Sequence, residues 1–136
     1  MIEKREVIQI KIPYPNMQSG LAKKSHMYIC VNKVHSTKRL VKCQTMKLPN
    51  IIGSIGVACY IIESPNIDRN PFSRPTMIDC DKLFIIDSLI PRSLLTKPRS
   101  DISEELHSEI AQKLKTNLPS RHRLSKEELK ELNSIL

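Results

Sequence analysis

The feature that most constrains the fold is where each kind of apolar spacing occurs along the chain. Up to residue 87, Val, Ile, Leu, Tyr and Cys alternate with polar residues or form short apolar runs, and Pro and Gly repeatedly interrupt them. Such runs predict short β-strands. We expect strands at 6–12, 26–34, 38–46, 57–63 and, as two pieces meeting near Asp81, 76–87.

Helical spacing appears only near the end of the chain. Asp101 and Glu104 have the spacing of a capping box, and they precede a row of leucine and isoleucine at every fourth position. Pro119 ends this long helix, and Ser125 with Glu128 predicts the start of a short one. The apolar row is Leu106, Ile110, Leu114 and Leu118.

This order of elements predicts a mainly β fold, a small antiparallel bent sheet or partly closed barrel with C-terminal helices. The 26–46 segment reads as a hairpin, and 57–63, the most apolar stretch, reads as the central strand. The 136 residues fit one domain, which we place at 1–118, followed by a short helical extension at 119–136.

Positive charge is concentrated in the first part of the chain. Residues 1–50 contain ten Lys and Arg against two Glu, whereas 51–136 contain twelve residues of each sign. The whole excess of +8 therefore belongs to the first strands and loops. Such asymmetry favours an anionic partner, nucleic acid first. The scarcity of aromatic residues (five, with no Trp) disfavours base stacking on an aromatic surface.

The cysteines and the absence of targeting motifs indicate a soluble cytoplasmic protein. Cys30, Cys43, Cys59 and Cys80 form no CxxC pair and no zinc-like spacing, so we expect free thiols in a reducing compartment. No signal peptide, lipidation motif or long apolar run is present, so no membrane association is expected. No metal site or cofactor is predicted.

One short stretch points to a ligand site. In "SGLAKKSHMYICV", residues 19–31, Lys23, Lys24 and His26 stand together where a loop becomes a strand. Two cations beside an imidazole suit an anionic ligand, since the imidazole also exchanges protons near neutral pH. A solvated loop is the plain alternative.

This stretch and a later one, "RPTMIDCDKLFIID…LIPRSLL", resemble the MazF/PemK group of toxin–antitoxin ribonucleases, which also includes CcdB-type gyrase poisons. The resemblance covers about residues 5–118. It implies an SH3-like barrel, metal-independent cleavage of single-stranded RNA, a cognate antitoxin and a homodimer. The Arg-Pro step of the family falls on Ser25 and His26, which leaves the family's catalytic arginine without a counterpart.

RNA cleavage of this kind needs a base, an acid and a cation near the phosphorus. We assign the catalytic work to Lys24 and His26, and the resemblance adds Thr45, at the end of a strand. The residues expected to contact RNA around them are Lys23, Ser25, Gln44 and Lys47. Asp79 and Asp81 are interpreted as packing and hydrogen-bonding groups rather than metal ligands.

Two other functions compete with this one. A CcdB-like gyrase poison needs an apolar hot spot at the end of its last helix, and the chain ends in "LNSIL". A catalytically silent RNA-binding barrel needs only the cationic surface. The tail residues Arg121, His122 and Arg123 either extend that surface or belong to a loosely attached helix.

Overall fold

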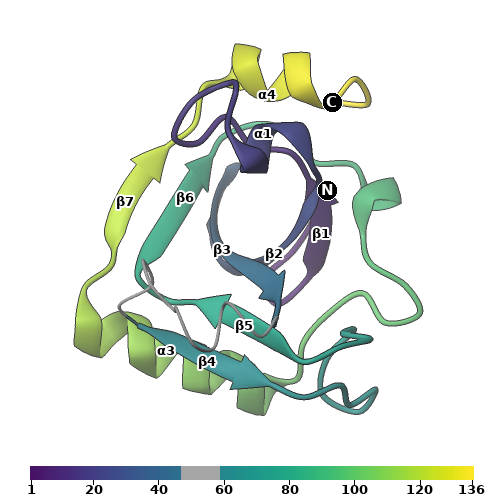
Figure 1. Cartoon of the computed structure of the whole chain (residues 1–136), viewed down its shortest axis with the longest axis vertical. Coiled ribbons are helices and arrows are strands. Elements are labelled where there is room, and N and C mark those ends of the chain that lie inside the picture. The colour runs from purple at the N-terminus through teal and green to yellow at the C-terminus, as the bar shows by residue number, and fades with distance from the viewer. Residues whose placement is uncertain (47–58) are drawn as a thin grey trace.

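The computed structural model describes residues 1–46 and 59–136, and it is mainly β (Figure 1). Seven strands of this part of the chain form one sheet. The strands are β1 (Val7–Ile10), β2 (His26–Val34), β3 (Thr37–Thr45), β4 (Tyr60–Glu63), β5 (Thr76–Asp79), β6 (Lys82–Ile86) and β7 (Ser120–Arg123). The helices are α1 (Gly20–Lys23), the 3-10 helix η1 (Arg92–Leu94), α3 (Glu104–Asn117) and α4 (Lys126–Leu132).

The sheet is bent and not closed. Its main path runs β1-β2-β3-β5-β4, and β6 pairs with β3 on one side and β7 on the other. Every ladder is antiparallel except that between β6 and β7. In Figure 1 the strands curl around one another, with α3 along one end and α4 at the other, and buried side chains fill the inside of the curl. The predicted mainly β fold with C-terminal helices is confirmed.

The predicted hairpin at 26–46 is the longest ladder of the sheet. β2 and β3 pair from Met27↔Cys43 to Val34↔Thr37, with an irregularity after Cys30. The turn places His35 at a φ of 57°, a left-handed conformation that histidine tolerates better than most residues.

Both faces of the sheet are buried, which explains why the middle of β2 is apolar on both sides. Side chains alternate between two clusters because a strand has a period of two. The inner face packs toward α4, and its cluster contains Ile8, Tyr28, Leu40 and Phe84 of the sheet and Leu129 of α4. The outer face packs under α3, and its cluster contains Val7, Ile29, Val41 and Ile78 of the sheet and Leu106 of α3.

The prediction that 57–63 is the central strand was wrong. Its described part, β4, lies at the end of the main path because β5 inserts between it and β3. Tyr60 and Ile62 are accordingly 39% and 55% exposed. A run of apolar residues indicates burial in general, but it does not say which strands will be its neighbours.

The long helix begins later than its sequence predicts. Ser103, not Asp101, caps α3, and its Oγ accepts a hydrogen bond from the Leu106 amide at 3.1 Å. Asp101 instead accepts from Arg99 Nε at 2.9 Å. The cap of α4 is as predicted, with Ser125 Oγ accepting from the Glu128 amide at 3.3 Å.

The tail after Pro119 is part of the sheet rather than a loosely attached helix. Residues Ser120–Arg123 form β7, which pairs in parallel with β6. Leu124 and Leu129 then enter the inner cluster. Periodicity did not reveal β7 because the sequence "SRHR" has no apolar residue. Among the described helices, none is long and apolar enough to cross a membrane.

Candidate functional site

The candidate site lies where β5 bends into β6. β3 pairs with β5 in the register Cys43↔Ile78 and with β6 in the register Leu40↔Phe84. The intervening residues, Cys80 and Asp81, change the register between the two ladders. Lys42 lies between the two paired segments of β3, so it faces the end of β5 and the start of β6. An irregularity of this kind redirects side chains, and such features recur beside active sites.

Five polar side chains gather at this bend, and we call them the bend cluster: Tyr28, Lys42, Asp79, Asp81 and Lys82. Lys42 Nζ lies 2.9 Å from Asp79 Oδ2, and Lys82 Nζ lies 3.2 Å from Asp81 Oδ2. Tyr28 is fully buried, and the side chain of Asp79 is 2% exposed. The other three side chains reach solvent in part.

Buried polar atoms of the bend cluster lack a hydrogen-bond partner within the described residues and, for the two named next, an ion pair as well. These two are the Tyr28 hydroxyl and Asp79 Oδ1. Buried polar groups in folded proteins are nearly always paired, so each exception needs an explanation. A site that receives a polar ligand or ordered water provides one.

Burial perturbs the proton equilibria of these same groups. It raises the pKa of the Asp79 carboxyl, an effect that Lys42 opposes and that neighbouring Asp81 reinforces. Burial also raises the pKa of the Tyr28 hydroxyl, with the Asp79 carboxylate adding to the effect. Perturbed titratable groups that share a partner are typical of functional sites.

β7 adds a serine and a histidine beside the bend cluster. Ser120 pairs with Lys82, and His122 pairs with Phe84 on the inner face. Ser120 Oγ and His122 Nε2 are 2.9 Å apart. The ring of His122 stands 4.6 Å from that of Tyr14, centroid to centroid, which holds the imidazole in place. By its register, His122 lies on the same face of the β6–β7 ladder as Lys82, and a positioned imidazole on such a face can move protons near a bound anion.

The structure divides the predicted site residues between two faces. His26 and Gln44 alternate in step with Tyr28 and Lys42, so they belong to the inner face. Thr45 pairs with Thr76 and alternates in step with Cys43, which places it on the outer face.

The loop residues of the predicted site are solvent-exposed. Lys23 ends α1, Lys24 follows it, and Ser25 precedes β2. The Lys24 carbonyl lies 3.0 Å from His26 Nδ1. Lys47 lies outside the described residues.

Sequence reasoning missed Lys42, Lys82 and the inner-face position of His122. One signal was present: Lys42 stands between Val41 and Cys43, both buried, and a lysine in such a position needs a partner. Asp79 and Asp81 were interpreted as packing and hydrogen-bonding groups rather than metal ligands, and the bend that brings Asp79 to Lys42 is not visible in the sequence. Within residues 1–46 and 59–136, no group of three or more His, Cys, Asp or Glu is placed to hold a metal ion.

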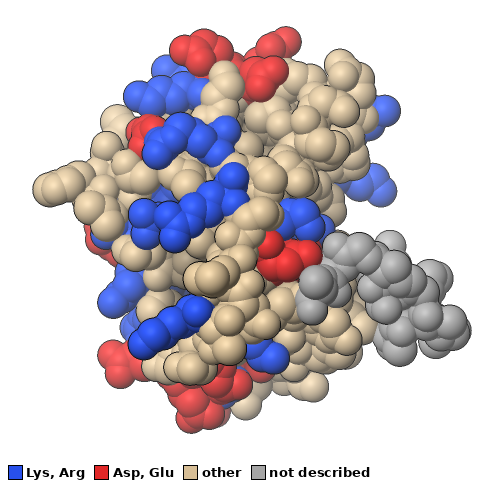
Figure 2. All heavy atoms as spheres, turned by 90° about the vertical axis from the view of Figure 1, so that its left-hand side faces the viewer, with Lys and Arg blue, Asp and Glu red and all other residues tan. Residues whose placement is uncertain are grey.

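The surface around β7 is rich in positive charge. Figure 2 shows Lys and Arg across the middle of this side of the molecule, with Asp and Glu mainly at its upper and lower ends. β7 itself contributes Arg121 and Arg123, so the tail adds to the basic surface that the first strands were expected to provide. Arg123 forms an ion pair with Asp87, with 2.6 Å between Nη1 and Oδ2.

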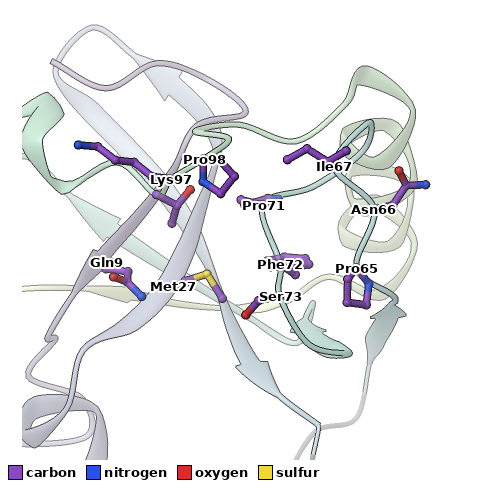
Figure 3. Close-up of a pocket in the computed structure, with 11 residues that line it drawn as sticks. Gln9, Met27, Pro65, Asn66, Ile67, Pro71, Phe72, Ser73, Lys97 and Pro98 are labelled. Atoms are coloured by element: carbon purple, nitrogen blue, oxygen red, sulfur yellow. The ribbon is translucent and has the colours of Figure 1, made fainter.

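Away from the bend cluster, a pocket of about 460 Å³ lies on the outer face between the β1–β2 ladder and the loop 64–75 (Figure 3). Met27 and Gln9 form one wall, and Phe72 and Ser73 stand opposite. Lys97 is the one charged side chain among its described lining residues. It therefore suits an uncharged group, and it lacks the acid–base chemistry of the bend cluster.

Fold and site together define a class: a small bent β-sheet protein with a polar cluster at a strand bend and a basic surface beside it. Comparison with models of protein families, with curated proteins and with solved structures found no match to this chain.

Proposed function

We propose that this protein binds single-stranded RNA at the bend cluster and the edge strand β7 beside it and cuts it there without a metal ion, as the toxin of a toxin–antitoxin pair. The observation that carries the proposal is the bend cluster. It combines buried, unpaired polar atoms with two lysines and lies next to a positioned histidine. An acid–base group beside cations is what phosphodiester cleavage requires.

In the proposed cleavage reaction, each accessible histidine and lysine of the site has a role. His122 takes the proton of the ribose 2′-hydroxyl as its oxygen attacks phosphorus, and His26 supplies a proton to the departing 5′-oxygen. The products are a 2′,3′-cyclic phosphate and a free 5′-hydroxyl. Lys42 and Lys82 stabilise the negative charge that grows on the phosphorane oxygens.

Asp79 and Tyr28 are positioning residues, because both are buried beneath the groups that reach solvent. Asp79 holds Lys42 through the 2.9 Å ion pair. Lys23, Lys24 and Gln44 remain candidates for contacts with the RNA backbone. Thr45, on the outer face, has the weakest support of the residues first assigned to catalysis.

The proposed partners follow from the same surface. An acidic, disordered antitoxin segment would compete with RNA for the lysines. A homodimer and action in the cytoplasm are parts of the proposal that derive from the resemblance to the MazF/PemK group.

The direct test is incubation of the purified chain with single-stranded RNA in EDTA and, separately, in Mg²⁺. We expect cyclic-phosphate products under both conditions. His122→Gln and Lys82→Ala should each reduce the cleavage rate by about 100-fold, the scale of losing one acid–base or charge-stabilising group. His35→Gln is the matched control, because His35 is exposed in the β2–β3 turn. RNA left intact under both conditions would remove the enzymatic claim.

The same assay separates the competing functions. Salt-sensitive RNA binding without products would identify a catalytically silent RNA-binding barrel. Trapped gyrase–DNA complexes without RNA products would identify a gyrase poison, in which case Ile135, 55% exposed near the chain end, is the residue to replace first.

A further inference from the structure

A cleft on the outer face gathers cations that no carboxylate neutralises. It has a volume of about 510 Å³ and lies between the C-terminal end of α3 and the sheet. Arg39 of β3, Lys115 of α3 and Arg121 of β7 line it, and no acidic residue does so among the described residues. Its apolar lining includes Val31, Leu83 and Leu114.

The arginines of the cleft differ from most others in this chain in having no ion pair with a carboxylate of the described residues. Five of the eight form ion pairs with carboxylates: Arg5, Arg69, Arg92, Arg99 and Arg123. Two of the other three, Arg39 and Arg121, meet in this one cleft. Neither they nor Lys115 has an ion pair or side-chain hydrogen bond with another described residue. Three guanidinium and ammonium groups that converge without a counter-ion favour an anionic ligand.

The cleft and the bend cluster lie on opposite faces of the β6–β7 ladder. Arg121 stands between Ser120 and His122 in β7, and its side chain alternates to the outer face, beside Leu83. Within the described sheet β7 pairs only with β6, so it forms an edge. A ligand that passes over this edge can contact His122 on one face and Arg121 on the other.

We infer that the cleft binds phosphates of the same single-stranded RNA whose scissile bond lies at the bend cluster. This inference rests on the proposed function and adds the course of the RNA beyond the site. Arg39 and Arg121 contact phosphate oxygens through their planar forks, and Lys115 adds a point charge. The apolar floor receives a ribose or a base face. The volume lies in the range of sites for nucleotide-sized ligands.

The test compares two double variants that remove the same charge. Arg39→Gln with Arg121→Gln empties the cleft of its guanidinium groups. Arg74→Gln with Lys97→Gln removes two exposed cations from the loop side, away from β7, and is the matched control. Binding of a fluorescent single-stranded RNA is measured by anisotropy over a range of salt concentrations, with a non-cleavable 2′-deoxy substitution at the scissile site.

We expect the cleft variant to lower the slope of log K against log [salt] by about 0.7 for each lost phosphate contact, or about 1.4 in all. The control variant should leave the slope unchanged. Shortening the RNA until it fills only the bend cluster should abolish the difference between the cleft variant and the wild type. Equal losses in both variants, or no loss in either, would overturn the inference.

The outcomes also separate this inference from the proposed function. If the wild type cuts RNA and the cleft variant binds it with an unchanged slope, the cleft assignment alone fails. If the wild type binds RNA through the cleft but leaves cleavable RNA intact, the enzymatic proposal alone fails. Absence of RNA binding by the wild type would overturn both. Thermal unfolding of each variant confirms that it is folded.

Discussion

Two clusters of charged residues, each containing one buried carboxylate (Glu63 and Asp79), differ in how completely they are paired. In the first, Arg69 donates to Glu63, Glu105 and Glu109 at 2.6–2.7 Å. Asn70 donates a further hydrogen bond to Glu63. In the bend cluster, by contrast, the Tyr28 hydroxyl and an oxygen of Asp79 lack partners among the described residues.

The difference separates a structural network from a candidate site. Arg69 joins the loop 64–75 to α3, and its bonds to carboxylates raise the pKa of its guanidinium above the ordinary value. Such a network contributes to stability only while it is complete. Leaving buried polar atoms without partners costs stability, so the bend cluster carries a cost that the Arg69 network avoids.

The largest expected effect tests the structural network. Arg69→Ala leaves Glu63, which is 6% exposed, without its cation, and should lower the free energy of unfolding by about 3 kcal/mol. Urea unfolding measures the change. Arg74→Ala, in the same loop but exposed, should stay within about 0.5 kcal/mol of wild type. Similar losses in both variants would mean that the network has no special role.

A smaller effect concerns the pH dependence of the bend cluster. The pKa of Asp79 is raised in the folded state, so the fold favours the protonated carboxyl. Its contribution to stability is therefore largest below the ordinary aspartate pKa and declines as pH rises toward the raised pKa. Relative to Asp79→Asn, the wild type should lose stability over that interval, as measured by urea unfolding at several pH values.

Asp87 provides the control of opposite sign. Its pKa is lowered by the hydrogen bond from Thr37 and by Arg123. It therefore stabilises the fold above the ordinary aspartate pKa and loses that effect as pH falls through the lowered pKa. The Asp87→Asn and Asp79→Asn differences should slope in opposite directions with pH. Slopes of the same sign would contradict the assigned environment of Asp79.

The smallest expected effect on stability comes from Tyr28→Phe. Removing a buried hydroxyl without a partner should change the free energy of unfolding by less than about 1 kcal/mol. RNA cleavage should nevertheless slow, because the hydroxyl is proposed to position the site. A stability loss above about 2 kcal/mol would show instead that the hydroxyl is bonded in solution, and the contrast between the two clusters would disappear.

Much of the fold could be predicted because its signals are local. The alternation in "HMYICVNKV" and "KRLVKCQTM" placed β2 and β3 almost to the residue, and Ser125 marked the start of α4. The prediction of β4 as a central strand failed, since strand order depends on pairing between distant segments. β7 was missed because it has no apolar periodicity.

The candidate site was less predictable than the fold, and the reason is the bend at Cys80 and Asp81. Without this bend, Asp79 and Lys82 would face different neighbours, and Lys42 would be an isolated lysine on β3. His26 and Gln44 were placed on the correct strands, and alternation along β3 already puts Thr45 on the opposite face from its neighbour Gln44. That His26 shares the face of Gln44 depends on the pairing of β2 with β3, which joins residues far apart in the chain.

The amino-acid sequence by itself determined the class of fold, the hairpin, the cap of α4 and the excess of positive charge, because each depends on local composition or on spacing between near neighbours. The tertiary structure alone decided which charges are neutralised. Ion pairs and buried contacts join residues far apart in the chain, so only the folded sheet could leave Arg39 and Arg121 without carboxylates while surrounding Arg69 with three.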